Sequence, residues 1–133
     1  MNPELHSSSK NAEAMNTRGL RHLQAGRNDL AESDFKSAIV IDSNFVAAWG
    51  NLINCQRAMG KSDDAIVTAQ SGISLGIENA DLHNNYGSVL FGLGQFEFAL
   101  SEFKKAVGIN PSHSVAQLNI IKSFFCLNQS FNA

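Results

Sequence analysis

The chain has 133 residues, of which 44% are hydrophobic and 17% are charged, and its formal net charge is -2. A near-neutral chain without a basic stripe argues against nucleic-acid binding, which depends on neutralising phosphates. No apolar run reaches the roughly 18 residues of a membrane span, and the polar first ten residues lack the apolar core of a signal peptide, so we expect a cytoplasmic protein with no membrane partner.

Residues 1–11 are polar and contain three consecutive serines and a proline. Segments of this composition bury too little apolar surface to become ordered by themselves. We therefore expect a disordered N-terminal lead-in over residues 1–11.

From residue 12 onward the apolar residues recur at the spacing of amphipathic helices, and no strand signal interrupts them. Gly26, Gly60 and Gly94 are the expected helix stops, because glycine readily takes the left-handed conformation that ends a helix. Asn28 or Asp29 is expected to cap the second helix and Asn79 the fifth. The predicted helices span residues 12–25, 29–41, 45–59, 62–75, 80–93, 97–109 and 113–127.

The sequence repeats with a period of 34 residues. Small residues recur at Ala31, Ala65 and Ala99, and the position four residues later holds Phe35, Ala69 and Phe103. One helix pair cannot bury a core alone, so each pair must pack against its neighbours. The predicted repeats are 14–47, 48–81, 82–115 and a partial repeat, 116–133, all within one array over residues 12–133.

Several residues in this register form a known motif. The second repeat has Trp49-x2-Leu52, with Ile53 in place of a glycine, and the third has Tyr86-Gly87, Ala99-x3-Phe103 and Pro111. This pattern resembles the tetratricopeptide repeat (TPR) family. The resemblance implies an all-α fold, a right-handed α-solenoid of antiparallel helix pairs with seven helices. It also implies a protein-interaction module whose first helices line a concave groove for an extended peptide or a helix of a partner.

One groove position repeats as Asn51, Asn85 and Asn119, with Thr17 in the first repeat. Each asparagine offers both hydrogen-bond donors and an acceptor to the backbone of an extended peptide. The arrangement is similar to the asparagine ladder of the O-linked N-acetylglucosamine transferase superhelix. The alternative is that asparagine is common at this position and holds neighbouring helices together. One helical turn further along, the sequence places Asn54, Ser88 and Lys122, which would widen the same polar strip.

The TPR subclass that binds acidic chaperone tails needs lysine or arginine at defined groove positions. Those positions hold Asn16, Leu20, Asp81 and Asn85 here, and only Asn51 fits the pattern. A groove without paired cations binds a C-terminal carboxylate poorly. The sequence therefore argues against this subclass.

The last seven residues align with residues 93–99, so we expect the chain to end in the first turn of a fourth repeat's second helix. The seventh helix is apolar on more than one face, which makes it a poor cap. Either the chain continues as a longer array, or it forms a homo-oligomer through Ile120, Phe124 and Phe125. A further alternative is that the chain is the recognition arm of a larger enzyme, such as a glycosyltransferase.

Catalytic and metal-binding patterns find little support in the sequence. It shows no nucleophile–base pair, phosphate-binding loop or metal-ligand spacing among its four histidines and two cysteines. We therefore expect a non-enzymatic chain without cofactor or metal, with both cysteines free. Arg18, Arg21 and Arg27 are expected on the solvated surface, and His83, which replaces the aromatic Trp49 of the preceding repeat, is expected to be half-buried.

Overall fold

The computed structural model describes the backbone of residues 3–132 and the side chains of residues 8–129. Within that part of the chain there are seven helices and no strand, which confirms the predicted all-α class. The helices are α1 (Pro3–Gln24), α2 (Asn28–Ile41), α3 (Val46–Ala58), α4 (Ser62–Ser74), α5 (Ala80–Gly92), α6 (Phe96–Ile109) and α7 (Ser114–Asn132). None of the described helices combines the length and the apolar character that crossing a membrane requires.

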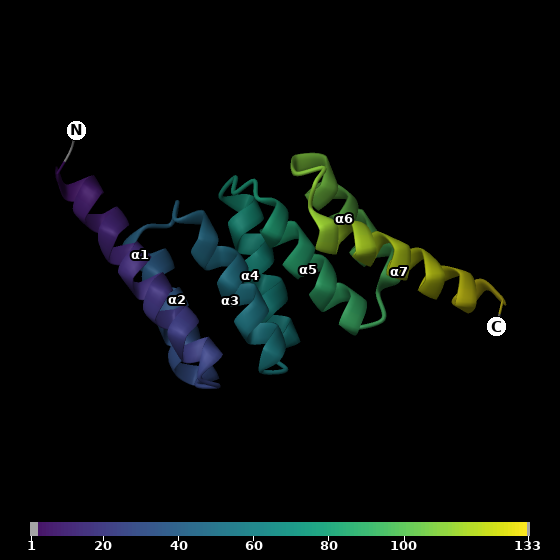
Figure 1. Ribbon diagram of the computed structural model, residues 1–133, viewed down its shortest axis with the longest axis horizontal. Helices are drawn as coiled ribbons and strands as arrows, with labels where there is room; N and C mark the ends of the chain where they lie inside the picture. The colour runs from purple at the N-terminus through teal and green to yellow at the C-terminus, as the bar shows by residue number, and fades with distance from the viewer. Residues whose placement is uncertain (1–2, 133) are drawn as a thin grey trace. The chain divides into compact units, whose positions relative to one another are not determined.

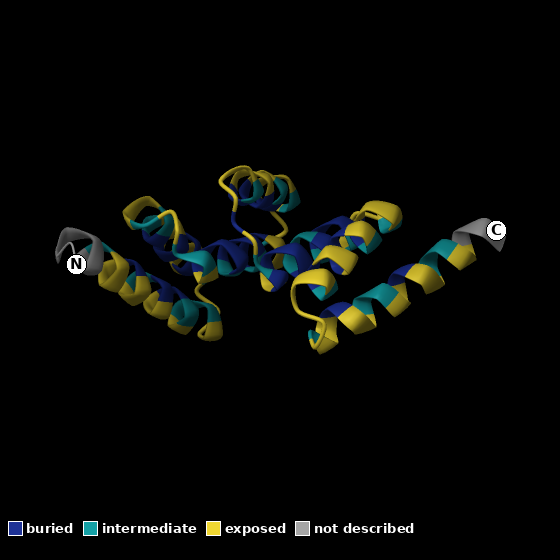
Figure 2. Cartoon of the chain, turned by 90° about the horizontal axis from the view of Figure 1, so that it is seen from above, coloured by how far each residue is buried: buried dark blue, intermediate teal, exposed yellow. Residues whose placement is uncertain are grey.

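The chain consists of two compact units, Met1–Ile77 and Glu78–Ala133. In the first unit α1 packs against α2, α2 against α3, and α3 against α4. In the second unit α6 packs against both α5 and α7. Consecutive helices within each unit run in opposite directions, as predicted (Figure 1). The buried residues lie on the helix sides that face their neighbours (Figure 2).

Close packing within the helix pairs depends on size matching between two positions. A Cβ atom added at Gly19 would lie 2.6 Å from Cε1 of Phe35, and one added at Gly87 would lie 2.6 Å from Cε1 of Phe103. Both phenylalanines are fully or almost fully buried. In the second repeat the same two positions hold Ile53 and Ala69, which are also fully buried. Large and small residues have therefore exchanged places between repeats.

The helix ends follow the predicted glycine stops. Gly26, Gly60 and Gly94 have φ angles of 77°, 75° and 78°, and Gly76, which the sequence analysis missed, has a φ of 84°. Asn79 caps α5 as predicted, because its Oδ1 accepts a hydrogen bond from the Leu82 amide at 3.0 Å. The predicted cap of the second helix was wrong: α2 already begins at Asn28, and Arg27 precedes it without a side-chain cap.

The structure differs from the prediction at both ends of the array. Helix α1 begins at Pro3, so residues 3–11 are helical where we expected a disordered lead-in. Proline is favourable in the first turn of a helix. The helix is also anchored by packing, because Ala12 is fully buried with Ala38 and Ala48. Residues 1 and 2 lie outside the described residues. At the other end α7 continues to Asn132 without the expected turn after residue 127. Asn128 stands where Gly94 ends α5, and no described residue other than glycine has a positive φ.

Candidate interaction surface on the first helices

The asparagine ladder (Asn51, Asn85 and Asn119) lies on α3, α5 and α7, the first helices of successive repeats. All three side chains are half-buried, whereas Thr17 on α1 is exposed. Asn51 belongs to the first unit, and Asn85 and Asn119 belong to the second. The structure thus gives the three amides the same register and similar burial within their own helices.

Two ladder amides bind a neighbouring asparagine in the same way. Asn51 Nδ2 donates to Asn16 Oδ1 at 2.9 Å, and Asn119 Nδ2 donates to Asn84 Oδ1 at 3.0 Å. Each bond joins the first helices of two successive repeats, α1 to α3 in the first unit and α5 to α7 in the second. Asn16 and Asn84 were not predicted as partners of the ladder, although their 68-residue separation is twice the repeat.

The polar residues one turn further along have different environments. Asn54 Oδ1 accepts a hydrogen bond from Arg57 at 2.6 Å, and the Ser88 hydroxyl donates to the backbone oxygen of Asn84 at 3.0 Å. Lys122 is exposed on α7. Asn54 and Ser88 are thus held by their own helices, while Lys122 contributes a positive charge.

The positions that would hold a chaperone-tail carboxylate carry no cation. Asn16 is buried beside Asn51, and Leu20 packs against the core of the first unit. Asp81 is exposed, and its Oδ1 lies 2.7 Å from Nε2 of His113. An acidic Asp81 would repel a carboxylate at this position.

The outer side of α7 exposes large apolar side chains. Leu118, Ile121 and Phe125 are 51%, 65% and 64% exposed, and their spacing places them on one side of the helix. Of the residues predicted for self-association, Phe125 belongs to this side. Ile120 is half-buried, and Phe124 is half-exposed with Lys104 Nζ 5.4 Å from its ring centroid. We call Leu118, Ile121 and Phe125 the α7 apolar stripe.

A row of buried polar residues on the second helices was missed by the sequence analysis. Asp34, Thr68 and Glu102 lie exactly 34 residues apart, and all three are at most 9% exposed. Each contacts a polar side chain on the first helix of its own pair, which is Arg18 for Asp34, Gln56 for Thr68 and His83 for Glu102. The row therefore joins the two helices of every complete pair.

In the first pair Arg18 holds Asp34 through two hydrogen bonds. Arg18 Nε donates to Oδ2 at 2.8 Å, and Nη2 donates to Oδ1 at 2.7 Å. The hydrogen bond from Arg18 lowers the pKa of the Asp34 carboxyl, burial opposes this shift, and the charges of Arg18 and His22 add to it. Arg18 is exposed as expected, but its guanidinium is bonded within the first unit.

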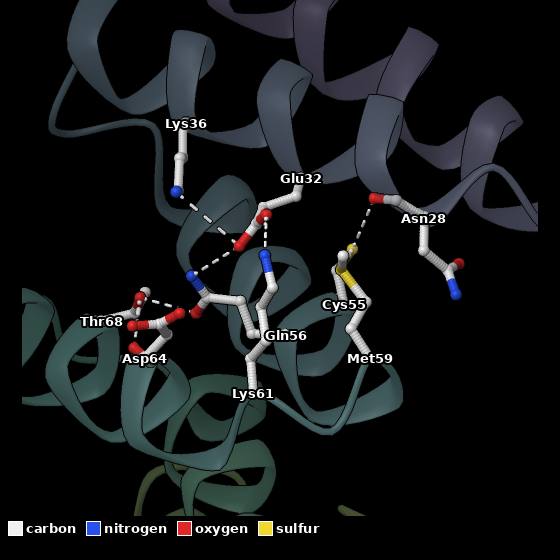
Figure 3. A network of polar contacts seen from close by, with 9 residues as sticks. All are labelled: Asn28, Glu32, Lys36, Cys55, Gln56, Met59, Lys61, Asp64 and Thr68. Atoms are coloured by element: carbon white, nitrogen blue, oxygen red, sulfur yellow. Dashed lines mark hydrogen bonds and ion pairs between the residues drawn. The ribbon is translucent and has the colours of Figure 1, made fainter.

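Glu32 organises a second polar network in the first unit (Figure 3). Its carboxylate accepts hydrogen bonds from Lys61 Nζ at 2.9 Å and from Gln56 Nε2 at 3.2 Å. Thr68 in turn donates to Gln56 Oε1 at 2.7 Å. Burial raises the pKa of Glu32, but the hydrogen bonds from Lys61 and Gln56 and the charges of Lys36 and Lys61 outweigh it, so the pKa is lowered. The network connects α2, α3 and the start of α4.

In the second unit His83 and Glu102 form a buried pair. His83 Nδ1 lies 2.7 Å from Glu102 Oε2, and Lys105 Nζ donates to Glu102 Oε1 at 2.9 Å. His83 is only 4% exposed, so it is more deeply buried than the half-buried position we expected. It occupies the register of Trp49, which is also buried in the preceding repeat.

Among the described residues no group of His, Cys, Asp and Glu could hold a metal ion. Both cysteines are free, as predicted, and Cys55 is buried with Sγ 3.5 Å from the Asn28 carbonyl oxygen. Burial raises the pKa of the Cys55 thiol, and the nearby charge of Glu32 adds to this effect. A buried thiol with a raised pKa is a poor nucleophile.

Comparison with known proteins identifies the repeat. A family model described as tetratricopeptide repeat matches residues 80–113. An uncharacterised protein of Haemophilus influenzae is 26% identical over 88 residues, which cover 66% of this chain and 49% of that protein. The chain thus spans about half the length of this curated relative.

Solved structures support the fold. The first TPR domain of human RPAP3 has a TM-score of 0.84 at 16% identity, with 92% of this chain and 97% of that chain covered. The Sgt2 TPR domain from Aspergillus fumigatus has a TM-score of 0.85 at 10% identity, with coverage of 92% and 82%. The first TPR of Spaghetti (RPAP3), bound to an HSP90 peptide, has a TM-score of 0.81 at 17% identity, with coverage of 90% and 95%. These similarities confirm the predicted α-solenoid class.

Proposed function

We propose that the chain is a non-enzymatic interaction module, located in the cytoplasm, that binds an extended peptide segment of a partner protein. The proposal draws on the α-solenoid fold and on the tetratricopeptide-repeat match over residues 80–113. The proposed peptide contacts are the ladder positions, which are Asn51 with Thr17 in the first unit and Asn85 with Asn119 in the second. Asn54, Ser88 and Lys122 border this strip.

The observation that carries the proposal is the repetition of one half-buried amide on three first helices at 34-residue intervals. Side-chain amides that recur once per repeat suit a ligand whose own donors and acceptors recur regularly, and an extended peptide backbone is such a ligand. A solved TPR domain with this fold carries a bound peptide. Since the carboxylate-binding cations are absent from the expected positions, we propose internal segments rather than C-terminal tails as ligands.

The proposal predicts a loss of affinity when the ladder is removed. Peptides of 12 residues selected from a random library on the native protein will bind the triple variant N51A/N85A/N119A at least about tenfold more weakly, because each lost hydrogen bond contributes about 1 kcal/mol. Isothermal titration calorimetry of the tightest selected peptide measures this.

The matched control is N44A/N128A, which removes two exposed asparagines outside the ladder. This control should bind the peptide as the native protein does. Unchanged affinity in the triple variant, with its folded state confirmed by circular dichroism, would refute the role of the ladder.

A second candidate function is self-association through the seventh helix. It is favoured by the α7 apolar stripe, because single exposed apolar residues are common whereas a contiguous row of three large ones marks an interaction surface. We propose that a second copy covers this stripe, with Phe124 and Ile120 at its border.

Light scattering behind size exclusion tests this second candidate over a concentration series. Self-association predicts a mass that rises above the 14.4 kDa of one chain, and a return to 14.4 kDa in the variant I121E/F125E. A constant 14.4 kDa for the native protein up to millimolar concentration would exclude the dimer and leave the ladder as the surface to pursue.

A further inference from the structure

Two buried asparagines lie beside the ladder, one in each unit. Asn16 on α1 is 7% exposed and Asn84 on α5 is 6% exposed, and each accepts a hydrogen bond from the ladder residue 35 positions later. The donor is Nδ2 of Asn51 in the first unit and Nδ2 of Asn119 in the second. The same bond has formed twice, with the same atoms in the same roles.

This bond determines which way the amides of Asn51 and Asn119 point. The side-chain amide of asparagine is planar, with its two donors on the nitrogen and its acceptor on the opposite oxygen. When Nδ2 of Asn51 or Asn119 turns toward the buried asparagine, Oδ1 of the same group turns away from it. An asparagine without such a partner can present either its nitrogen or its oxygen.

We infer that Asn16 and Asn84 are positioning residues that fix the amide orientation of Asn51 and Asn119, so that these two ladder positions present carbonyl oxygens and recognise backbone N–H donors of the bound peptide. This inference rests on the proposed function and specifies its chemistry. Because the Oδ1 atoms of Asn51 and Asn119 are already oriented before the peptide binds, no side-chain entropy is lost when they accept from the peptide N–H groups, and affinity is higher.

The burial of the two positioning residues supports this role. A side chain that is 6–7% exposed is confined by its surroundings, so its acceptor oxygen keeps one position. The ladder asparagines, by contrast, are half-buried and retain access to a ligand.

The test compares two double variants in the full chain. N16A/N84A removes both acceptors, whereas N16D/N84D keeps an oxygen that accepts from Nδ2 in the same place. The first readout is the pair of side-chain NH2 signals of Asn51 and Asn119 in a ¹⁵N correlation spectrum. The second is affinity for the tightest peptide of the library selection and for its analogue with N-methylated backbone amides.

We expect the NH2 signals of Asn51 and Asn119 to move to the positions of a free asparagine in N16A/N84A and to stay near native values in N16D/N84D. Affinity for the unmodified peptide should fall about three- to tenfold in N16A/N84A, which corresponds to one or two weakened hydrogen bonds. In N16D/N84D most of the native affinity should be retained. The N-methylated peptide should bind the native protein more weakly and should lose nothing further in N16A/N84A.

Other results separate this inference from the proposed function. If N51A/N119A lowers affinity but N16A/N84A changes only the free energy of unfolding, the two buried asparagines merely join helices and the inference is overturned. If N51A/N119A leaves affinity unchanged, the proposed function itself fails, and the inference fails with it. Unchanged NH2 signals in N16A/N84A would overturn the inference whatever the peptide does.

Discussion

Replacing Gly87 with isoleucine will lower the free energy of unfolding by about 3 kcal/mol, near the upper end of the usual cost of overpacking a core. The reason is the 2.6 Å separation between a Cβ atom at residue 87 and Cε1 of Phe103, with Cδ1 at 2.7 Å. Phe103 is 1% exposed and has little room to move away. Urea denaturation followed by circular dichroism measures the change.

The same change will cost much less when Phe103 is alanine. F103A alone should destabilise by about 3–5 kcal/mol because it leaves a cavity, but G87I/F103A recreates the pair that the second repeat already has in Ile53 and Ala69. We expect the double variant to be more stable than the sum of the single changes predicts, by about 2–3 kcal/mol. If the stability losses of the two single variants simply added up in the double variant, the side chains at residues 87 and 103 would not compensate for each other in size.

Gly108 supplies the control for the glycine substitutions. It lies in α6, and a Cβ atom added there would meet no atom within 4 Å. G108A should therefore raise the free energy of unfolding, by up to about 0.5–1 kcal/mol, because alanine loses less backbone entropy in a helix than glycine does. If G108A instead lowered the free energy of unfolding, the clash with Phe103 would not be the reason why substitution of Gly87 destabilises the protein.

Removing the Glu102 carboxylate will also lower the free energy of unfolding substantially. E102A leaves His83 almost fully buried without the acceptor that now lies 2.7 Å from Nδ1, and an unsatisfied buried polar group costs about 1–3 kcal/mol. The exposed Glu97 in the same helix is the matched control, because E97A should change stability by less than 1 kcal/mol. Equal effects of the two changes would contradict the importance of the buried pair.

The Glu102 pair also predicts the direction of a pH dependence. Burial raises the pKa of Glu102, but the hydrogen bonds from His83 and Lys105, together with their charges, outweigh it and leave the pKa lowered. The carboxylate therefore stabilises the fold fully above its unfolded pKa of about 4.3, and this contribution is lost as the pH falls through the lower folded pKa. E102Q should lose less stability than the native protein between pH 6 and pH 3, as measured by urea denaturation across this range.

The repeat register and the helix stops could be predicted because they depend on local rules. Helical spacing places apolar residues on one side, and glycine alone enters the left-handed conformation easily, so Gly26, Gly60 and Gly94 marked the helix ends correctly. The end of α7 could not be predicted by alignment alone. Asn128 occupies the register of Gly94, but it continues the helix instead of ending it.

The polar contacts of the interior needed the structure. Residues 34, 68 and 102 are all polar and share one register, yet their partners Arg18, Gln56 and His83 come from three different positions of the repeat. The ladder itself followed from the sequence register. Its partners Asn16 and Asn84 did not, because the bond connects helices that only the packing within each unit brings together.

The most direct measurement of the central claim is a titration of the ¹⁵N-labelled protein with the tightest selected peptide. The proposed function predicts that the side-chain NH2 signals of Asn51, Asn85 and Asn119 shift together and saturate at the same peptide concentration. Shifts confined to the α7 apolar stripe, with the three asparagine signals unchanged, would contradict it and make self-association or another surface the basis of function.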